Sequence, residues 1–463
     1  MKKTIFLPAL LGICLAATAQ PDLKPVKVFP VDYLPVGTHK FDVMVQNSGT
    51  TFVPWGGFKI CWKVDNGPVN EVLPVTPTFA VAAGSQQVRS QGNFMAAFPT
   101  AGNHTLKVWT KLVSQTDANT ANDTITHLVK VREQMPLKNV LFEVFKHQAC
   151  CPCFPAAIYE DTVVSLKANY AIANIYTYNG DVIYNSDGEV INDQYGLAHP
   201  SVLYDRYRFP YANSLERNWY TMGSDYILED INERDRYYEP VEVKFNTFSY
   251  NSSTRLLKVK LRATFFDTVS GDLRFNLYLT EDSVKAWQGC AVPDPYDYYH
   301  HHVLRYMAGG PWGQSGSIPA SVSAGQTVSY EFTYTLPAAW KTDQINLIGL
   351  VQRYETDDQK RRVYNSTQMR FTEGATLAIA GPDDITEGIK LYPNPAAGKL
   401  FVETGGGNGR IAFSIIGLNG RVLHHEEAAG SRTELDIRQL PAGVYLLRAT
   451  AEHGVKTIRF TKE

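Results

Sequence analysis

The sequence predicts a multidomain, mainly β protein that contains one α/β segment. Short stretches of alternating apolar and polar residues, separated by turns rich in Gly, Asn and Asp, recur before residue 135 and after residue 240. This pattern is typical of antiparallel β-sandwiches. Between them, an apolar strand, a helix and a second apolar strand follow one another, as in a parallel βαβ unit. A length of 463 residues is enough for several domains of roughly 150 residues each.

The first 19 residues predict a signal peptide. Lys2 and Lys3 precede an apolar run from Ile5 to Ala17, and Ala17-Thr18-Ala19 has the small-x-small form of a cleavage site. We therefore expect an exported mature chain that begins at Gln20. No later stretch has the roughly 18 consecutive apolar residues of a membrane-spanning helix, so we expect no transmembrane helix.

Residues 20–135 predict an immunoglobulin-like β-sandwich. Residues 41–47, 58–64 and 105–109 have the composition of strands, and Asn-Ser-Gly and Asp-Asn-Gly turns lie among them. Regularly spaced short strands of this kind are the signature of that sandwich.

A group of oxygen-bearing side chains follows, at Asp117, Asn119, Asn122 and Asp123. Such oxygen ligands could bind calcium. The sequence favours the alternative, a solvated loop whose Asx-turns precede the last strand. An incomplete calcium-loop pattern at residues 185–189, Asn-Ser-Asp-Gly-Glu, is expected to form a hairpin turn.

Residues 136–239 predict an α/β domain with a partly parallel sheet. Residues 139–145 form a mostly apolar run of strand length, residues 155–168 have apolar positions at helical spacing, and residues 170–175 return to a strand pattern. A helix-like stretch at residues 222–234 is expected to close this domain.

Cys150-Cys151-Pro152-Cys153 stands between the first strand and the helix. A thiolate at a helix N-terminus is stabilised by the helix dipole and by unpaired N–H groups, which lowers its pKa. The placement and the form Cys-x-Pro-Cys resemble the redox pair of thioredoxin-like proteins. The resemblance implies that Cys150 attacks a substrate disulfide and that Cys153 resolves the intermediate.

Two further features resemble that family. Residues 199–206, His-Pro-Ser-Val-Leu-Tyr-Asp-Arg, resemble its proline-led strand, which implies a cis peptide before Pro200 and contact of this proline with the disulfide. Glu143, on the strand that leads to the cysteines, lies where the family often has a buried acid, which implies a role as base.

Differences from thioredoxin leave other roles of the cysteines open. His199 replaces a small or β-branched residue, and Cys151 adds a third thiol. In an oxidising setting outside the cytoplasm, a bond between Cys150 and Cys153 could be purely structural. Together with His147, the three thiols could instead bind copper(I) or zinc, although no second group of ligands is evident.

Residues 240–371 predict a second β-sandwich, with strand patterns at residues 256–262, 273–279 and 328–332. His300, His301 and His302 are consecutive in this segment. Neighbouring side chains of a strand point to opposite faces, so only His300 and His302 could share a metal ion. We expect a surface loop or strand edge instead.

The remaining cysteines cannot all pair. Of six in the sequence, one lies in the predicted signal peptide, which leaves five in the mature chain. If Cys150 and Cys153 pair, Cys61, Cys151 and Cys290 are left, so at least one is free or intermolecular.

Residues 372–388 are rich in Gly, Ala, Thr and acidic residues and predict a linker. Residues 389–463 combine apolar alternations with Asn-Pro, Asn-Gly and Ala-Gly turns, which predict a small antiparallel β-sandwich. They carry, in order, Ile-Lys-Leu-Tyr-Pro-Asn-Pro at 389–395, Ile-Ile-Gly-Leu-Asn-Gly-Arg at 415–421 and Leu-Pro-Ala-Gly-Val-Tyr-Leu-Leu-Arg at 440–448. The series resembles the C-terminal sorting domain of the type IX secretion system. It implies handling by that machinery and delivery to the cell surface, outer membrane or medium.

A second resemblance covers roughly residues 22–371. It rests on Glu143 with the cysteine pair, Thr-Glu-Asp-Ser-Val at 280–284, Gln288, Tyr-His-His-His-Val-Leu-Arg at 299–305, Leu-Val-Gln at 350–352 and Val-Tyr-Asn-Ser at 363–366. These motifs resemble the outer-membrane-protein-28-related family, which implies a thioredoxin-like core with β-sandwich domains.

Two functions remain open. The sandwiches could recognise an unknown surface ligand while the cysteines stabilise a loop, as in a non-enzymatic binding protein. Alternatively, Cys150 and Cys153 could serve an extracytoplasmic thiol–disulfide oxidoreductase that acts on a protein thiol partner. A formal net charge of −2 gives no electrostatic basis for binding nucleic acid, and neither function requires a cofactor.

Overall fold

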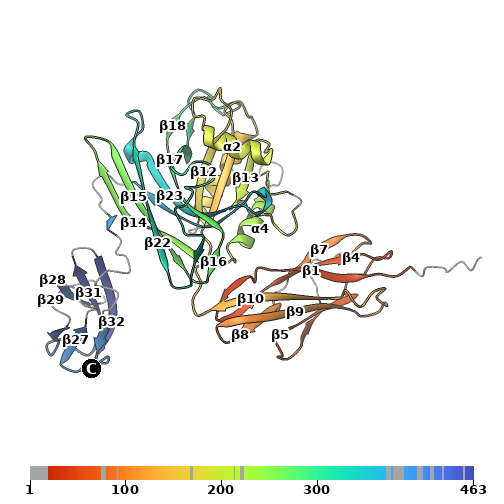
Figure 1. The fold of residues 1–463 in the computed structure, drawn as a ribbon, viewed down its shortest axis with the longest axis horizontal. Helices are drawn as coiled ribbons and strands as arrows, with labels where there is room; N and C mark the ends of the chain where they lie inside the picture. The colour runs from red at the N-terminus through yellow and green to blue at the C-terminus, as the bar shows by residue number, and fades with distance from the viewer. Residues whose placement is uncertain are drawn as a thin grey trace, which may run out of the picture. The chain divides into compact units, whose positions relative to one another are not determined.

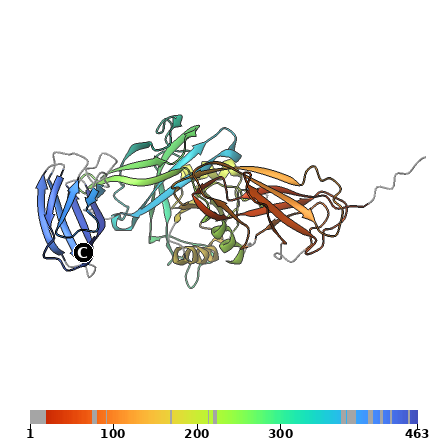
Figure 2. The same cartoon turned by 90° about the horizontal axis from the view of Figure 1, so that it is seen from below.

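The computed structural model describes residues 19–463 apart from 74–79, 91, 167–169, 213, 219–223, 372–376, 379–389, 404–409, 418–421, 430–431 and 452–453. The predicted signal peptide, apart from Ala19, lies outside the described residues, as does the predicted linker apart from Leu377–Ala378. The chain is mainly β, as predicted, with its strands arranged in several sheets (Figures 1 and 2). No helix within the described ranges combines the length and the apolar character that crossing a bilayer requires.

The chain divides into two compact units. The first contains residues 1–138, 208–215 and 229–240, and the second contains residues 139–207, 216–228 and 241–463. Residues 136–239, expected to form one domain, are thus shared between the two units.

The first sandwich is built from antiparallel neighbours, apart from the parallel pair β2–β10. One sheet has the order β1-β4-β7 and another the order β2-β10-β9-β5-β6, while β3 pairs with β8. The core between them includes Val43, Ile60 and Val108, and the Trp62 ring packs edge-on against Phe41 at 5.4 Å between centroids. The strands are β1 (Leu23–Phe29), β2 (Tyr33–Pro35), β3 (Gly37–Lys40), β4 (Asp42–Asn47), β5 (Phe58–Val64), β6 (Asn70–Val72), β7 (Gln86–Arg89), β8 (Met95–Phe98), β9 (Gly102–Leu112) and β10 (Thr124–Arg132).

A single sheet runs through the second unit in the order β13-β11-β12-β20-β17-β23-β24. The predicted parallel pairing is confirmed between β11 and β12, and β13 lies antiparallel on the other side of β11. Asn174 of β12 pairs with Val303 of β20, so strands from the predicted segments 136–239 and 240–371 form one continuous sheet. These strands are β11 (Val140–Lys146), β12 (Tyr170–Tyr176), β13 (Ser201–Tyr204), β17 (Asp272–Glu281), β20 (Val303–Met307), β23 (Ile345–Tyr354) and β24 (Arg362–Arg370).

Another sheet, in the order β22-β15-β14-β25, shares an apolar core with the strands β17 and β23. Leu261, Phe275 and Leu347 are fully buried in this core. A Cβ at Gly349 would lie 2.5 Å from the Leu261 side chain, so glycine permits the close approach of β23 to β15. The strands are β14 (Val241–Asn251), β15 (Leu256–Phe265), β22 (Thr327–Thr335) and β25 (Leu377–Ala378), with the short pairs β16 (Val269–Ser270) and β21 (Ser321–Val322), and β18 (Val284–Lys285) and β19 (Tyr299–His300).

Helices α1 (Cys153–Leu166), α2 (Ser186–Tyr195) and α4 (Ser224–Arg234) belong to the α/β segment. The expectation of a hairpin turn at residues 185–189 is wrong, because Asn185 caps helix α2 and Ser186 begins it. Asn185 caps this helix by accepting a hydrogen bond from Gly188 N–H at 2.8 Å. A Cβ at Gly188 would lie 2.1 Å from the Ile175 side chain, so glycine allows α2 to pack closely on β12 (Figure 1).

Residues 390–463 form a module with its own core, which includes Leu400, Phe413, Leu447 and Phe460. Its sheets have the orders β26-β27-β30 and β29-β28-β31-β32. The strands are β26 (Lys390–Tyr392), β27 (Lys399–Glu403), β28 (Arg410–Gly417), β29 (Val422–Ala429), β30 (Arg432–Asp436), β31 (Gly443–Ala451) and β32 (Gly454–Lys462).

Candidate functional site

The cysteines of the α/β segment lie in a short loop, residues 147–153, which we call the cysteine loop. Strand β11 ends at Lys146 and helix α1 begins at Cys153. The Cys150 N–H donates to the carbonyl of His147 at 3.1 Å, and the Cys153 N–H lies 3.1 Å from the Cys150 Sγ. The sequence therefore places Cys150 where the first amide of the helix can donate to its sulfur.

A buried ion pair fixes the two ends of this loop. Lys146, at the end of β11, pairs with Glu160 of α1, and both side chains are almost completely buried. The second carboxylate oxygen of Glu160 accepts from Asn174 Nδ2 at 2.7 Å. Helix α1 is thereby tied to both β11 and β12.

Four cysteines form two disulfides. Cys150 bonds to Cys153, and Cys151 bonds to Cys290, which is 139 residues later in the chain. Cys150 and Cys153 are only 5% and 2% exposed, whereas Cys151 and Cys290 are both exposed. Cys61 is a free, buried thiol on β5. The pairing of Cys151 could not be found from sequence, although an unpaired third thiol in an oxidising setting signals that a partner is needed.

The residues beside Cys290 also contact the cysteine loop. Gln288 Nε2 donates to the carbonyl of Cys150 at 3.0 Å, and the Gly289 N–H donates to the carbonyl of Gln148 at 2.6 Å. In the other direction, Gln148 Nε2 donates to the carbonyl of Trp287 at 2.5 Å. Gln288 is therefore a positioning residue that no chemical argument from the sequence identified.

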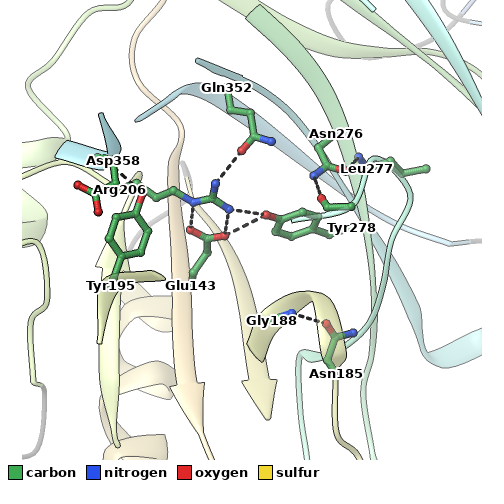
Figure 3. A network of polar contacts seen from close by, with 11 residues as sticks. Glu143, Asn185, Gly188, Tyr195, Arg206, Asn276, Leu277, Tyr278, Gln352 and Asp358 are labelled. Carbon is green, nitrogen blue, oxygen red and sulfur yellow. Dashed lines mark hydrogen bonds and ion pairs between the residues drawn. The ribbon is translucent and has the colours of Figure 1, made fainter. Parts of the chain in front are cut away.

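Glu143 lies in a buried polar network rather than alone. Its carboxylate accepts two hydrogen bonds from the Arg206 guanidinium, at 2.8 and 2.7 Å, and one from the Tyr278 hydroxyl at 2.9 Å (Figure 3). Arg206 Nη1 also donates to Gln352 Oε1 at 3.0 Å. Burial by itself lowers the pKa of Arg206, but the charge and hydrogen bonds of Glu143, together with the nearby Tyr278 and Tyr195, more than offset this effect and raise the pKa. Glu143 is thus the counter-ion of a permanently charged group.

Arg206 reaches this position because of an unusual turn. Asp205 and Arg206 both have left-handed backbone conformations, with φ of 54° and 52°, which residues other than glycine rarely adopt. Asp205 Oδ1 accepts from the Leu141 N–H at 2.8 Å, and its own N–H donates to the Leu141 carbonyl at 2.9 Å. The turn after β13 thus forms two hydrogen bonds with Leu141 of β11, one to its N–H group and one to its carbonyl.

Pro200 and its neighbours lie at the start of β13. The His199–Pro200 peptide is cis. The rings of His199 and His147 are perpendicular, with centroids 5.2 Å apart, and His199 Nε2 lies 2.8 Å from the Thr177 hydroxyl. Burial and the nearby His147 lower the pKa of His199 to about 4. His199 thus contacts the first residue of the cysteine loop, His147.

The three consecutive histidines do not lie on one strand, which sharing of a metal ion by His300 and His302 assumed. Strand β19 ends at His300, and His302 has a left-handed φ of 53°, so His300 and His302 do not share a strand. His300 ends the short strand β19 and is only 2% exposed. The His300 Nδ1 lies 2.7 Å from the Tyr176 hydroxyl, whereas the His302 Nδ1 lies 3.4 Å from the Asp282 Oδ1.

The polar loop of the first sandwich brings carboxylates together. Ligand oxygens of Asp22, Asp117 and Asp123 lie within 4.8 Å of one another. Burial, followed by the charges of Asp117 and Asp22, raises the pKa of Asp123 to about 6. The expected Asx-turn hydrogen bonds are also present, since Asp117 accepts from the Asn119 N–H and Asn119 from the Ala121 N–H.

Comparison with known proteins identifies the C-terminal module. Residues 390–463 match the family model of the secretion system C-terminal sorting domain. This segment is a type IX sorting domain. The chain is therefore exported to the cell surface, outer membrane or extracellular space, and the type IX machinery handles it. No curated protein matches the chain.

Several solved structures are similar to parts of the chain. HBP35 of Porphyromonas gingivalis has 15% identity and a TM-score of 0.41, over 70% of this chain and 98% of that one. A domain of the outer membrane lipoprotein Omp28 from the same organism has 15% identity and a TM-score of 0.19, over 29% of this chain and 88% of that one. The CARDB domain of the Pyrococcus furiosus PF1109 protein, in complex with di-metal ions, has 18% identity and a TM-score of 0.20, over 24% of this chain and 94% of that one.

Proposed function

We propose that this protein, after export by the type IX machinery, is a non-enzymatic surface or binding protein of the outer-membrane-protein-28-related family. In this proposal, the sandwiches recognise a surface ligand, and the cysteines stabilise the thioredoxin-like segment at residues 136–239. The observation that carries the proposal is the burial of the Cys150–Cys153 bond, whose cysteines are 5% and 2% exposed. Thiol exchange requires a sulfur that a substrate thiolate can reach.

The surroundings of Glu143 support the same conclusion. A base must accept a proton from the reacting thiol, yet this carboxylate already accepts two hydrogen bonds from Arg206 and one from Tyr278. Protonating it would leave the Arg206 charge buried without a counter-ion, which is strongly unfavourable. The network therefore favours a structural role for Glu143.

An assay of insulin reduction tests the proposal. The wild type and the Cys150→Ser/Cys153→Ser variant are expected to give the same background rate of insulin reduction by dithiothreitol. The matched control is Cys61→Ser, which removes a thiol from another part of the chain. A wild-type rate at least tenfold above that of the double variant would contradict the proposal.

One contact favours the alternative, a thiol–disulfide oxidoreductase. The Cys153 N–H lies 3.1 Å from the Cys150 Sγ, and an amide at a helix N-terminus stabilises a thiolate. If this alternative holds, Cys150 is the attacking thiol and Cys153 the resolving one. The insulin assay separates the two functions directly.

A further inference from the structure

The loop at residues 286–298, which we call the latch loop, connects β18 to β19 and is fixed at its base. The Ala286 N–H donates to the Tyr298 carbonyl at 3.2 Å, and the His300 Nε2 lies 3.2 Å from the Ala286 carbonyl. Burial is the main cause that lowers the pKa of His300 to about 4, so its ring is neutral at neutral pH. Its Nδ1 can then accept from the Tyr176 hydroxyl while Nε2–H donates to Ala286.

The middle of the latch loop contacts the backbone of the cysteine loop. Gln288 holds the carbonyl of Cys150, and Gly289 approaches so closely that a Cβ would lie 3.2 Å from the carbonyl oxygens of Gln148 and Ala149. Gln288 itself is 2% exposed. The latch loop thus holds the backbone of residues 148–150, shortly before the buried Cys153, in place.

The Cys151–Cys290 disulfide joins the two loops and, unlike the buried Cys150–Cys153 bond, lies at the surface. Cys151 and Cys290 are both exposed, and Val292, two residues further along, is 72% exposed. We propose that the Cys151–Cys290 bond is the site at which this protein exchanges with external dithiols, and that its reduction releases the latch loop and opens access to Cys150–Cys153. This inference goes beyond the proposed binding function, because release of the latch loop exposes Cys150–Cys153 to a small dithiol and does not require that the protein reduce a protein substrate such as insulin.

The dithiol supplies the two electrons and the two protons that reduction of the Cys151–Cys290 bond requires. One thiolate of the dithiol attacks the Cys290 Sγ, a mixed disulfide forms, and the Cys151–Cys290 bond breaks. Cys151 leaves as a thiolate, which the N-terminus of α1 two residues later stabilises, and then takes up a proton. The second thiol of the dithiol attacks the mixed disulfide and releases Cys290, so the dithiol is oxidised to a disulfide and both cysteines are reduced to thiols.

Release of the latch loop follows from the backbone of Cys290. This residue has a left-handed φ of 62°, a conformation that a non-glycine residue keeps only where its surroundings hold it. Once the bond to Cys151 is broken, the hydrogen bonds of Gln288 and Gly289 to the cysteine loop are no longer supported by a covalent tie. The loop can then leave the sulfurs of Cys150 and Cys153 accessible.

Stepwise reduction of the oxidised wild-type protein tests the order of the two bonds. The protein is treated with increasing dithiothreitol, quenched under native conditions with N-ethylmaleimide and mapped by mass spectrometry. Cys151 and Cys290 are expected to be labelled at a dithiothreitol concentration at least tenfold below that needed for Cys150 and Cys153. Labelling of Cys150 and Cys153 first, or of all four together, would overturn the proposal.

A variant tests the latch itself. In Cys151→Ser/Cys290→Ser, the Cys150–Cys153 bond is expected to be reduced at least tenfold faster than in the wild type, while Cys61→Ser leaves this rate unchanged. An unchanged rate in the double variant refutes the latch. If that variant does not fold, wild-type protein alkylated selectively at Cys151 and Cys290 replaces it, with the same expected acceleration and the same refuting result.

Discussion

The first sandwich and the second unit are both built mainly from strands, but they are closed in different ways. In the first sandwich, β9 pairs with β10 and β5, and the cysteine of β5 stays a free thiol. In the second unit, β12 pairs with the much later β20, and a disulfide joins residues 139 positions apart. Closing a long connection costs conformational entropy, although this cost grows only slowly with length. In addition to its apolar core, the second unit contains buried ion pairs and a disulfide between distant segments.

The largest expected effect concerns the buried ion pair of the second unit. Glu143→Gln removes the counter-ion of Arg206 and leaves a buried, unpaired charge. We expect it to lower the free energy of unfolding by about 3–5 kcal/mol. Guanidinium denaturation of the full exported chain measures the loss, and hydrogen exchange in β11 localises it to the second unit.

An ion pair of the first sandwich provides the matched control. Lys59 and Glu71 pair at 2.6 Å between neighbouring strands, and their side chains are 35% and 47% exposed to solvent. Glu71→Gln is expected to cause no measurable loss, because solvent screens such pairs. If Glu143→Gln is no more destabilising than Glu71→Gln, the second unit does not depend on its buried charges.

The same difference explains what the sequence could predict. The alternation in β5 and β9 and the apolar runs of β11 and β12 are local, so they identify these strands directly. The position of the cysteine loop follows from the same pattern. The Arg206–Glu143 pair, the Cys151–Cys290 bond and the β12–β20 pairing join segments far apart in sequence, and no local period encodes them. The break at His302 was missed because a left-handed residue leaves no signature in an otherwise β-like stretch.

In the first sandwich, a substitution of Asp123 is expected to raise the free energy of unfolding, by less than Glu143→Gln lowers it. The pKa of Asp123, raised to about 6 by burial and by Asp117 and Asp22, lies above that of an unfolded aspartate. The folded state therefore binds more protons between about pH 4 and pH 6, and stability is lost as pH rises through this window. Asp123→Asn is expected to stabilise the protein at pH 7 by about 1 kcal/mol, after discounting for solvent screening.

Thermal unfolding at several pH values checks this prediction. The difference in stability between Asp123→Asn and the wild type should grow from pH 4 to pH 6 and then level off. Asp117→Asn is the control, because Asp117 accepts from the Leu23 and Asn119 N–H groups, and the variant is not expected to gain stability. Stabilisation of the wild type by added Ca²⁺, abolished in Asp123→Asn, would instead indicate that the three carboxylates bind a cation.

A similarly small effect on stability is expected for the free thiol of the first sandwich. Cys61 is 2% exposed, and burial, more than the nearby Glu71, raises its pKa. Because the thiolate is the reactive form, Cys61 is expected to resist iodoacetamide at pH 8 in the folded protein and to react fully in guanidinium. Cys61→Ala should cost only about 1 kcal/mol, as expected for a small apolar side chain. Rapid labelling of Cys61 in the folded protein would mean that the first sandwich opens locally. The first sandwich would then differ from the disulfide-linked second unit in its dynamics as well as in its stabilising contacts.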